Sequence, residues 1–371
     1  MSVSDEERQR HTLPARAYVE RSVYEAELDH VFARSWIFAC PERVVAQPGS
    51  FATANVAGEP VAIVRGDDGV LRALSNVCRH RAMQILDGTG TCPKVLRCPY
   101  HGWTYRQDGQ LAAVPEARGF ADLDREGVRL PAFRVETLAG LVFVSLDADL
   151  PPLAEWFGDA AERLESLGIA GLKATGPLVV EYPYNWKNLA DNYLEGYHIP
   201  IGHPGLLRML DYKQYDPQLG RRHAWISAPL RDKPSVVRRE RLYQRLVRPM
   251  DAYPPDLHGS WAYAHLFPGL FLDLYPDQYD TWQLVPLGPE RTMTITWVFT
   301  PEREPFANRI ARRINWRFND AVMGEDKTLC AGVQRGLGAR TYERGVLNRN
   351  ERAIAHYHDL LRELMPGIDD V

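Results

Sequence analysis

The sequence contains no long apolar run and no excess of positive charge. Its longest apolar stretches, such as residues 138–146, have the length of a strand and fall short of the ~20 residues that a membrane helix needs. The start, MSVSDEERQR, is charged and lacks the apolar core of a secretory signal. A formal net charge of −4 offers no basic surplus for neutralising phosphates. We therefore expect a cytoplasmic protein that binds neither membranes nor nucleic acid.

Cysteine is also scarce. Five cysteines in 371 residues, an odd number, argue against a disulfide framework in a reducing compartment. Any clustered cysteines are better explained as metal ligands. The composition, 45% hydrophobic and 25% charged, is typical of a globular protein. The length favours about two domains.

Residue patterns divide the chain into three parts. Residues 1–37 have apolar residues at helical spacing and predict a helical segment that packs with the C-terminal part. Residues 38–150 contain short strands, with hairpin signals at two Asp-Gly pairs. Residues 151–371 mix both periods and predict an antiparallel sheet with helices near 186–198 and 306–337. The expected fold class is α+β, with an all-β domain ahead of a mixed domain.

Two short motifs place cysteine and histidine at metal-ligand spacing. Cys78-Arg-His80 and Cys98-Pro-Tyr-His101 are separated by seventeen residues, and each lies in a turn after a strand-like run. Two thiolates and two imidazoles suit a two-iron, two-sulfur cluster, in which two histidines bind one iron and two cysteines the other. Histidine fills 11 of 371 positions, so both offsets would arise by chance roughly once in a thousand trials.

Zinc is the competing metal, because two cysteines and two histidines also form a common structural zinc site. Three features disfavour zinc: the first motif is shorter than a zinc knuckle, each motif mixes thiol and imidazole, and the second motif continues as Gly-Trp. The run CPYHGW from residue 98 resembles the second cluster loop of the Rieske fold, and CRHR from residue 78 resembles the first. The resemblance implies that Cys78, His80, Cys98 and His101 bind a Rieske 2Fe–2S cluster.

More than two hundred residues beyond these motifs need another explanation. The run NWKNLADNYLEGYHIPIGHP contains Glu195, His198 and His203. Glu195 and His198 are three residues apart and are predicted to share one face of a helix. The proline and glycine that follow disturb this helix, so that a kink or turn returns His203 toward His198. Two imidazoles and one carboxylate on one face of an iron leave the opposite positions open, as in non-haem iron(II) oxygenases.

Taken alone, two histidines five residues apart are more readily explained as ordinary surface or core residues. After a Rieske motif, the segment resembles the iron-binding helix of Rieske oxygenase α subunits. In that family the acidic residue three before the first histidine links the two metal sites. It is aspartate in many members and Glu195 here, a longer side chain that resembles the branch acting on carnitine, betaine and related amines.

The third iron ligand should be a carboxylate later in the chain. Asp320, Glu325 and Asp326 lie in one predicted helix, where a solvated helix face is the alternative explanation. The run GED at 324–326, followed by VQRGL from residue 333, resembles the final ligand segment of the amine-oxidising branch and favours Asp326. The resemblance thus implies His198, His203 and Asp326 as ligands of the mononuclear iron.

The resemblance covers nearly the whole chain and implies a Rieske domain ahead of a helix-grip catalytic domain. It implies O2 as co-substrate and a separate reductase, with or without a ferredoxin, that passes electrons from NAD(P)H to the cluster and on to the iron. It also implies a homotrimer in which Glu195 bridges His101 of one subunit and His198 of the next. In the alternative, Glu195 only orients His198 within its own chain. A Rieske electron carrier without catalytic iron is the competing class, which the His198 and His203 pair disfavours.

Substrate class is less constrained by the sequence. The aromatic residues between positions 261 and 282 either flank an aromatic acid or form a cage for a quaternary ammonium group, although strand-core packing explains part of them. The first expectation is hydroxylation of an aromatic or other small organic acid. The alternative is monooxygenation or N-demethylation of a quaternary or methylated amine. The candidate pocket residues are His265, Trp261, Tyr263, Phe271 and Trp282.

Overall fold

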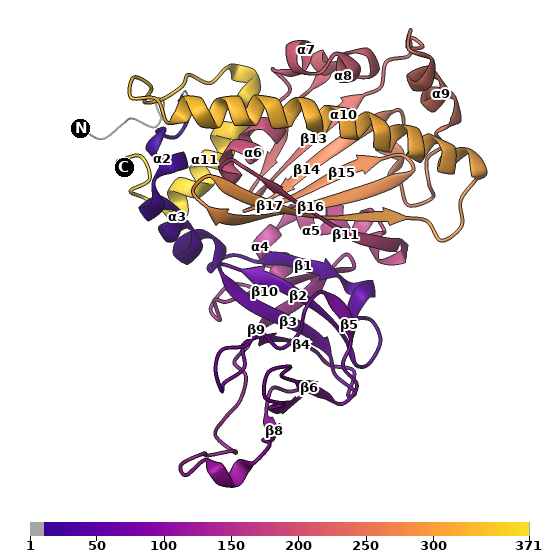
Figure 1. The fold of residues 1–371 in the computed structure, drawn as a ribbon. Helices are drawn as coiled ribbons and strands as arrows, with labels where there is room; N and C mark the ends of the chain where they lie inside the picture. The colour runs from indigo at the N-terminus through magenta and orange to yellow at the C-terminus, as the bar shows by residue number, and fades with distance from the viewer. Residues whose placement is uncertain (1–10, 371) are drawn as a thin grey trace. The chain divides into compact units, whose positions relative to one another are not determined.

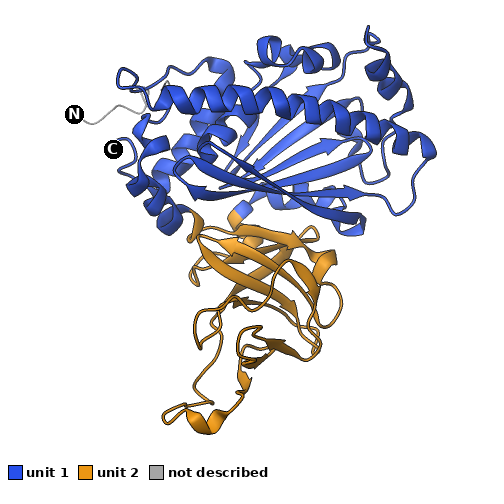
Figure 2. Cartoon of the chain, in the orientation of Figure 1, with its two compact units in different colours: residues 1–31, 157–371 blue, residues 32–156 orange. Residues whose placement is uncertain are grey.

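The computed structural model describes residues 11–370 and contains two compact units, which Figure 2 colours separately. Unit 1 comprises residues 1–31 and 157–371, and unit 2 comprises residues 32–156. The predicted boundaries, after residues 37 and 150, each lie six residues from these. The first ten residues of the predicted N-terminal segment lie outside the described residues, and the part from residue 11 to 31 belongs to unit 1.

Unit 2 is a β-structure with one large and one small antiparallel sheet (Figure 1). The seven-stranded sheet has the order β1-β10-β9-β4-β3-β2-β5, and the small sheet has the order β6-β7-β8. The strands are β1 (Ile37–Pro41), β2 (Ser50–Val56), β3 (Glu59–Arg65), β4 (Leu71–Ser75), β5 (Thr89–Thr91), β6 (Val95–Arg97), β7 (Thr104–Arg106), β8 (Leu111–Ala113), β9 (Ala132–Leu138) and β10 (Leu141–Ser145).

Both predicted hairpins are present in unit 2. Gly69 turns the chain between β3 and β4 with φ +78°, and Gly109 turns it between β7 and β8 with φ +89°. These are left-handed conformations that glycine adopts without a steric penalty. An added Cβ on Gly109 would lie 2.9 Å from the Leu130 carbonyl oxygen, so this turn excludes a side chain as well.

Unit 1 is built around a second seven-stranded antiparallel sheet, in the order β11-β17-β16-β15-β14-β13-β12. Its central strands are almost wholly buried. The strands are β11 (Lys173–Tyr182), β12 (Gln218–Gly220), β13 (His223–Pro229), β14 (Ser260–Leu266), β15 (Leu270–Tyr275), β16 (Gln278–Gly288) and β17 (Arg291–Thr300).

Helices surround this sheet, and the longest, α10, crosses one of its faces (Figure 1). No helix among residues 11–370 is long and apolar enough to cross a membrane. The helices of unit 1 are α2 (Arg16–Val19), α3 (Arg21–Glu27), α5 (Asp159–Ser166), α6 (Trp186–Tyr193), α7 (Ile199–Gly202), α8 (Pro204–Met209), α9 (Arg238–Leu246), α10 (Phe306–Leu337) and α11 (Arg352–Leu364), while α4 (Leu153–Phe157) lies where the chain passes from unit 2 to unit 1.

Helix α10 coincides with the helix predicted for residues 306–337. Pro305 precedes it, no proline interrupts it, and Gly338 follows it, as expected for helix boundaries. Its buried positions recur at helical spacing and include Phe318, Asp326 and Cys330. The helix contacts α6, α7, α8 and α9. It thereby brings a carboxylate from late in the chain to the segment around residue 200.

The N-terminal helices are tied to α6 by buried polar contacts. Glu27 and Lys187 form an ion pair in which both side chains are fully buried. The Trp186 indole N–H donates to the second Glu27 oxygen at 2.8 Å, and the Tyr18 hydroxyl donates to Asp191 at 2.6 Å. Because breaking one partner of a buried pair leaves an uncompensated charge, these contacts fix α6 firmly. The residues that follow α6 form the candidate site.

Candidate functional site

The two cysteine–histidine loops of unit 2 have the same backbone hydrogen bonds. In each loop the cysteine N–H donates to the carbonyl five residues later, at 2.9 Å for Cys78 and 2.8 Å for Cys98. Each cysteine carbonyl accepts from the N–H four residues later, at 3.1 Å. Ala82 and Gly102, which donate those bonds, have φ of +55° and +72°. The same left-handed turn therefore closes both loops and presents both ligand pairs.

The four predicted cluster ligands converge. The Cys78 and Cys98 side chains are each 2% exposed and contact each other. The His80 and His101 rings have centroids 4.6 Å apart, and His80 stacks on Trp103 with an interplanar angle of 4°. His80 Nδ1 is buried without a hydrogen-bond partner, although buried polar atoms are normally satisfied. Two paired thiols and an orphaned imidazole nitrogen fit a cluster of the Rieske type.

Tyr105 is a cluster-loop residue that the sequence analysis did not single out. Its hydroxyl oxygen accepts from the Arg79 backbone N–H at 2.9 Å and lies 3.3 Å from Cys78 Sγ. Since the amide occupies an oxygen lone pair, the hydroxyl proton is free to point at the sulfur. Hydrogen bonds to cluster sulfurs are among the factors that set a cluster's reduction potential.

In unit 1 the predicted helix over residues 186–198 is wrong in its second half. Asn185 caps α6 by accepting from the Lys187 N–H, and the helix ends at Tyr193. Glu195 and His198 therefore lie in a turn and do not share a helix face. An added Cβ on Gly196 would lie 2.8 Å from the Tyr215 ring, so the chain passes too close to this ring for any side chain.

His198 and His203 occupy helix boundaries. His198 precedes α7 and His203 stands between α7 and α8, each of which carries proline near its start. Proline is favoured in the first turn of a helix and disfavoured later. The IPIGHP sequence thus makes two very short helices, and the break between them returns His203 to His198, as predicted. Their ring centroids are 4.9 Å apart.

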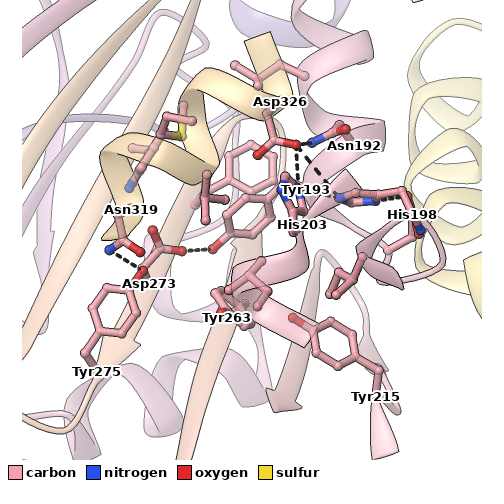
Figure 3. Close-up of a pocket in the computed structure, with 18 of the residues that line it drawn as sticks. Asn192, Tyr193, His198, His203, Tyr215, Tyr263, Asp273, Tyr275, Asn319 and Asp326 are labelled. Carbon is pink, nitrogen blue, oxygen red and sulfur yellow. Dashed lines mark hydrogen bonds and ion pairs between the residues drawn. The ribbon is translucent and has the colours of Figure 1, made fainter. Parts of the chain in front are cut away.

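The three predicted iron ligands lie together (Figure 3). His203 Nε2 is 3.0 Å from His198 Nε2 and 2.9 Å from Asp326 Oδ1, and His198 Nε2 is 3.8 Å from the same oxygen. Within residues 11–370 this is the one group of three such side chains whose ligand atoms lie within 4.8 Å of one another. Two nitrogens and one oxygen converge on a single point.

The outer nitrogens of both imidazoles are held by carboxylates. Glu195 accepts from His198 Nδ1, and Glu325 accepts from His203 Nδ1 at 2.8 Å. An imidazole that donates through Nδ1 leaves its Nε2 lone pair free, which is the form that binds a metal. Both free lone pairs point at the third ligand, so the donor set fits a mononuclear iron with a facial triad.

The remaining acids of the predicted helix have other roles. Glu325 is the partner of His203, and Asp320 is exposed and borders a different groove. Asp326 is 8% exposed and accepts a hydrogen bond from Asn192 at 2.8 Å. Asn192 is a further site residue that the sequence analysis missed. Its position in α6 one turn before Glu195 was the available signal.

A cavity of about 110 Å³ opens beside the three ligands. Of the predicted pocket residues, Tyr263, Phe271 and Trp282 line it, whereas His265 and Trp261 do not. Both of these residues project from the same face of β14 as Tyr263, at its two ends. His265 is covered by Tyr357 of α11 at 5.2 Å between ring centroids, and the Trp261 N–H donates to Tyr243 of α9.

Other lining residues were missed, among them Tyr193, Asp273 and Asn319. Asp273 lies on β15 in the run LFLDLY, where alternate residues face the cavity. A lone acid in an otherwise apolar strand was the signal. The Tyr193 hydroxyl donates to Asp273 at 2.6 Å (Figure 3). Burial raises the pKa of Asp273 to about 6, against the lowering effect of this hydrogen bond.

Comparison with known families agrees with this geometry. A family model described as the catalytic domain of ring-hydroxylating α subunits matches residues 164–367, and a Rieske [2Fe-2S] domain model matches residues 35–133. The chain belongs to the family of Rieske non-haem iron oxygenase α subunits. Members of this family use a 2Fe–2S cluster, a mononuclear iron and O2, so this oxygenase is an oxidoreductase.

Similar proteins include the carnitine monooxygenase oxygenase subunit of Escherichia coli K12, 31% identical over 95% of this oxygenase and 93% of that protein. Chloroplastic choline monooxygenase of Beta vulgaris is 29% identical over 95% of this chain and 77% of that one. The crystal structure of the quaternary ammonium Rieske monooxygenase CntA with L-carnitine is 26% identical, with a TM-score of 0.81 over 98% of this chain and 99% of that one. Naphthalene 1,2-dioxygenase from Rhodococcus, at 19% identity and a TM-score of 0.79, has the same fold.

Proposed function

We propose that this oxygenase hydroxylates a small quaternary or methylated amine, such that R–H, O2, two electrons and two protons give R–OH and water. The observation that carries this proposal is the aromatic-lined cavity that opens onto His198, His203 and Asp326. Aromatic faces attract ammonium groups. The relatives named for carnitine and choline support an amine, whereas the first expectation of an aromatic or other organic acid has no such support.

The chain's own residues would hold two metal centres. Cys78, His80, Cys98 and His101 would bind the cluster, and His198, His203 and Asp326 the iron, which supplies the position where O2 is activated. Glu195 and Glu325 keep both imidazoles in the metal-binding tautomer. Asn192 fixes one oxygen of Asp326. The cavity residues bind the substrate and exclude bulk water from the reacting C–H bond.

Electrons would arrive from a separate NAD(P)H-dependent reductase and cross between subunits of a homotrimer. His101 and its neighbour Tyr100 are exposed on unit 2, and Tyr197 and Ile201 are exposed beside the iron ligands on unit 1. Both metal centres therefore lie near surfaces that a partner subunit can cover. Glu195 would carry the connection, since its carboxylate already accepts from His198.

The competing class is a Rieske electron carrier without catalytic iron. Convergence of the two Nε2 atoms and Asp326 Oδ1 argues against it. Iron analysis separates the classes, because the enzyme needs about three irons per chain and the carrier two.

Oxygen uptake by the reconstituted protein tests the reaction. Purified protein with a reductase and NADH is supplied with choline, L-carnitine, glycine betaine, benzoate or salicylate. We expect O2 consumption and an oxidised product with an amine only. Oxidation of the aromatic acids without any amine turnover would overturn the proposed function.

A further inference from the structure

The cavity beside the iron ligands is lined by several acidic groups. Its lining includes Glu195, Asp273 and Asp326, and no lysine or arginine. Asp326 belongs to the iron site, and the Glu195 oxygens are engaged by His198 and by backbone N–H groups. Asp273 is left as the acid that neither the metal site nor an ion pair among residues 11–370 explains.

Asp273 is an expensive group to bury. Asp273 is only 5% exposed, and the groups that hydrogen-bond to it, foremost the Tyr193 hydroxyl, are neutral. Transfer of a carboxylate from water into an apolar site is costly unless a counter-charge accompanies it. Since no protein cation supplies that charge, a cation that enters the cavity is the natural partner.

The aromatic residues that line the cavity also favour a bound cation. Tyr193 meets Phe271 at 4.6 Å and Tyr263 at 6.0 Å between ring centroids, in edge-to-face arrangements, and Tyr215 lies 6.2 Å from Tyr263. The cation–π contacts recorded in the described chain all involve rings outside this cavity. The rings around Asp273 are therefore available to a ligand's ammonium group.

Basic side chains line a neighbouring groove. A larger groove along β11, β16, β17 and α10 contains six of them: Lys173, Arg303, Arg309, Arg312, Arg313 and Lys327. This groove and the cavity beside the iron ligands have three lining residues in common, Trp282, Asn319 and Met323. A carboxylate bound beside Asp273 would be desolvated next to like charge with no base in the same cavity.

The cavity is also small. Its volume of about 110 Å³ is below that of the engineered apolar cavity of about 150 Å³ that binds benzene. This space suits a compact ammonium head group.

Building on the proposed function, we infer that the substrate is a compact amine cation without a carboxylate, and that Asp273 is its counter-ion. A quaternary ammonium alcohol of the choline type has this chemistry, whereas carnitine and glycine betaine carry an additional carboxylate. Asp273 acts in binding and takes no part in the transfer of oxygen.

The charge rule, that the cavity binds a cation without a carboxylate and uses Asp273 as its counter-ion, is tested by calorimetric titration of the cluster- and iron-loaded enzyme. The four probes are choline, its neutral isostere 3,3-dimethylbutan-1-ol, glycine betaine and L-carnitine. We expect choline to bind about 30-fold or more tightly than the isostere, the size of a desolvated cation–π and ion-pair contribution. Both zwitterions should bind at least about 10-fold more weakly than choline.

The variant Asp273→Asn keeps the shape and removes the charge. Its choline affinity should fall about 30-fold, while the affinity for the neutral isostere and the iron content stay unchanged. Asp320→Asn, which removes the same charge from an exposed position outside this cavity, should leave all four affinities as they were. If Asp273→Asn misfolds, the choline-to-isostere ratio of the wild type still decides the question.

The outcomes distinguish this inference from the proposed function. If the amines are oxidised but a zwitterion binds as tightly as choline, or if Asp273→Asn weakens choline and its isostere equally, the charge rule is wrong and the amine oxygenase stands. If no amine binds and the aromatic acids are oxidised, both fail.

Discussion

The two metal sites of this oxygenase are assembled in opposite ways. The cluster ligands lie within 24 consecutive residues, from Cys78 to His101, on two loops with the same hydrogen bonding. The iron ligands His198 and His203 depend on Asp326, which is 123 residues further along the chain and arrives through α10. One site is a property of local sequence, and the other exists only when the tertiary fold is complete.

The sites also differ in exposure. His101 is exposed, whereas His203 is 1% exposed, Asp326 is 8% exposed and the His198 side chain is 22% exposed. An exposed ligand suits a cluster that exchanges electrons with other proteins, and a largely buried set suits an iron that must keep water from its open positions. Independent assembly and different exposure predict that the two sites can be damaged separately.

The largest effect is expected from loss of an iron ligand. Asp326→Ala should release the mononuclear iron and lower turnover by a factor of about 1,000 or more, because the iron position carries the O2 chemistry. The visible and paramagnetic spectra of the cluster should remain those of the wild type. Iron analysis and O2 uptake provide the measurements. Asp320→Ala is the control, and retention of iron by Asp326→Ala with loss in Glu325→Ala would reverse the assignment.

The converse experiment changes a cluster ligand and leaves the iron site intact. His101→Cys replaces a neutral ligand with a thiolate, so the reduction potential should fall by a large part of the roughly 250 mV or more that separates Rieske clusters from all-cysteine ones. Turnover should drop with it, while the iron of unit 1 remains bound. Potentiometric titration followed by electron paramagnetic resonance measures the shift. A colourless wild-type protein that contains zinc would remove the basis of this prediction.

The same contrast explains how much the sequence could predict. Spacing singled out Cys78, His80, Cys98 and His101 as metal-ligand candidates, since a turn keeps neighbours in the chain close in space, and the resemblance favoured the cluster over zinc. His198, His203 and Asp326 required family resemblance for their assignment, because no periodicity reveals which face of α10 meets α7 and α8. The α6 boundary was missed because Leu194 to Tyr197 contains no proline to end the helix, and tertiary contact at Gly196 determines the turn.

The pocket was the least predictable part for a related reason. The aromatic residues between positions 261 and 282 were predicted as pocket candidates without a strand assignment, and the structure places Trp261, Tyr263 and His265 on one face of β14. Which part of that face becomes cavity depends on the helices above it, and α9 and α11 cover the two ends. Helix placement over a sheet is a long-range property that single-sequence patterns do not contain.

Glu195 is where the two sites would communicate. Glu195→Gln keeps the size of the side chain but weakens its hold on the His198 N–H. We expect both metals to be retained and electron delivery to slow about 100-fold, the upper range for loss of a ligand-orienting contact. Rapid mixing of the reduced enzyme with O2 and substrate measures cluster oxidation. Oxidation at the wild-type rate, or full activity of a monomer, would contradict the bridge.

A smaller effect should follow from the amide that holds the third ligand. Asn192→Ala removes the hydrogen bond to Asp326 without changing a ligand, and iron affinity should fall about 10-fold. Titration of the apo-enzyme with Fe(II) measures it. The matched control is Asn319→Ala, since Asn319 donates to Tyr275 at 2.9 Å and not to a proposed ligand. Equal loss of iron affinity in both variants would show that the effect comes from a general loss of rigidity in the cavity and not from the contact with Asp326.

The smallest effect is a pH dependence of substrate affinity. Burial raises the pKa of Asp273 from 3.8 to about 6, so the folded protein favours the neutral acid, and ionising it costs stability as the pH rises from about 3.8 to about 6. An amine cation needs the charged form, so its affinity is present above the pKa and is lost as the pH falls through about 6. The ionised fraction changes roughly tenfold between pH 5 and 7 for such a group. The titratable groups around Asp273 are Tyr193, Tyr215, Tyr263, Tyr275 and Asp280, each with a pKa raised by burial.

We therefore expect the choline dissociation constant of the loaded wild type to rise as the pH is lowered from 7 to 5. That of Asp273→Asn should stay flat, with iron content followed in parallel so that metal loss is recognised. An equal slope in the variant would assign the pH dependence to the metal ligands and not to Asp273.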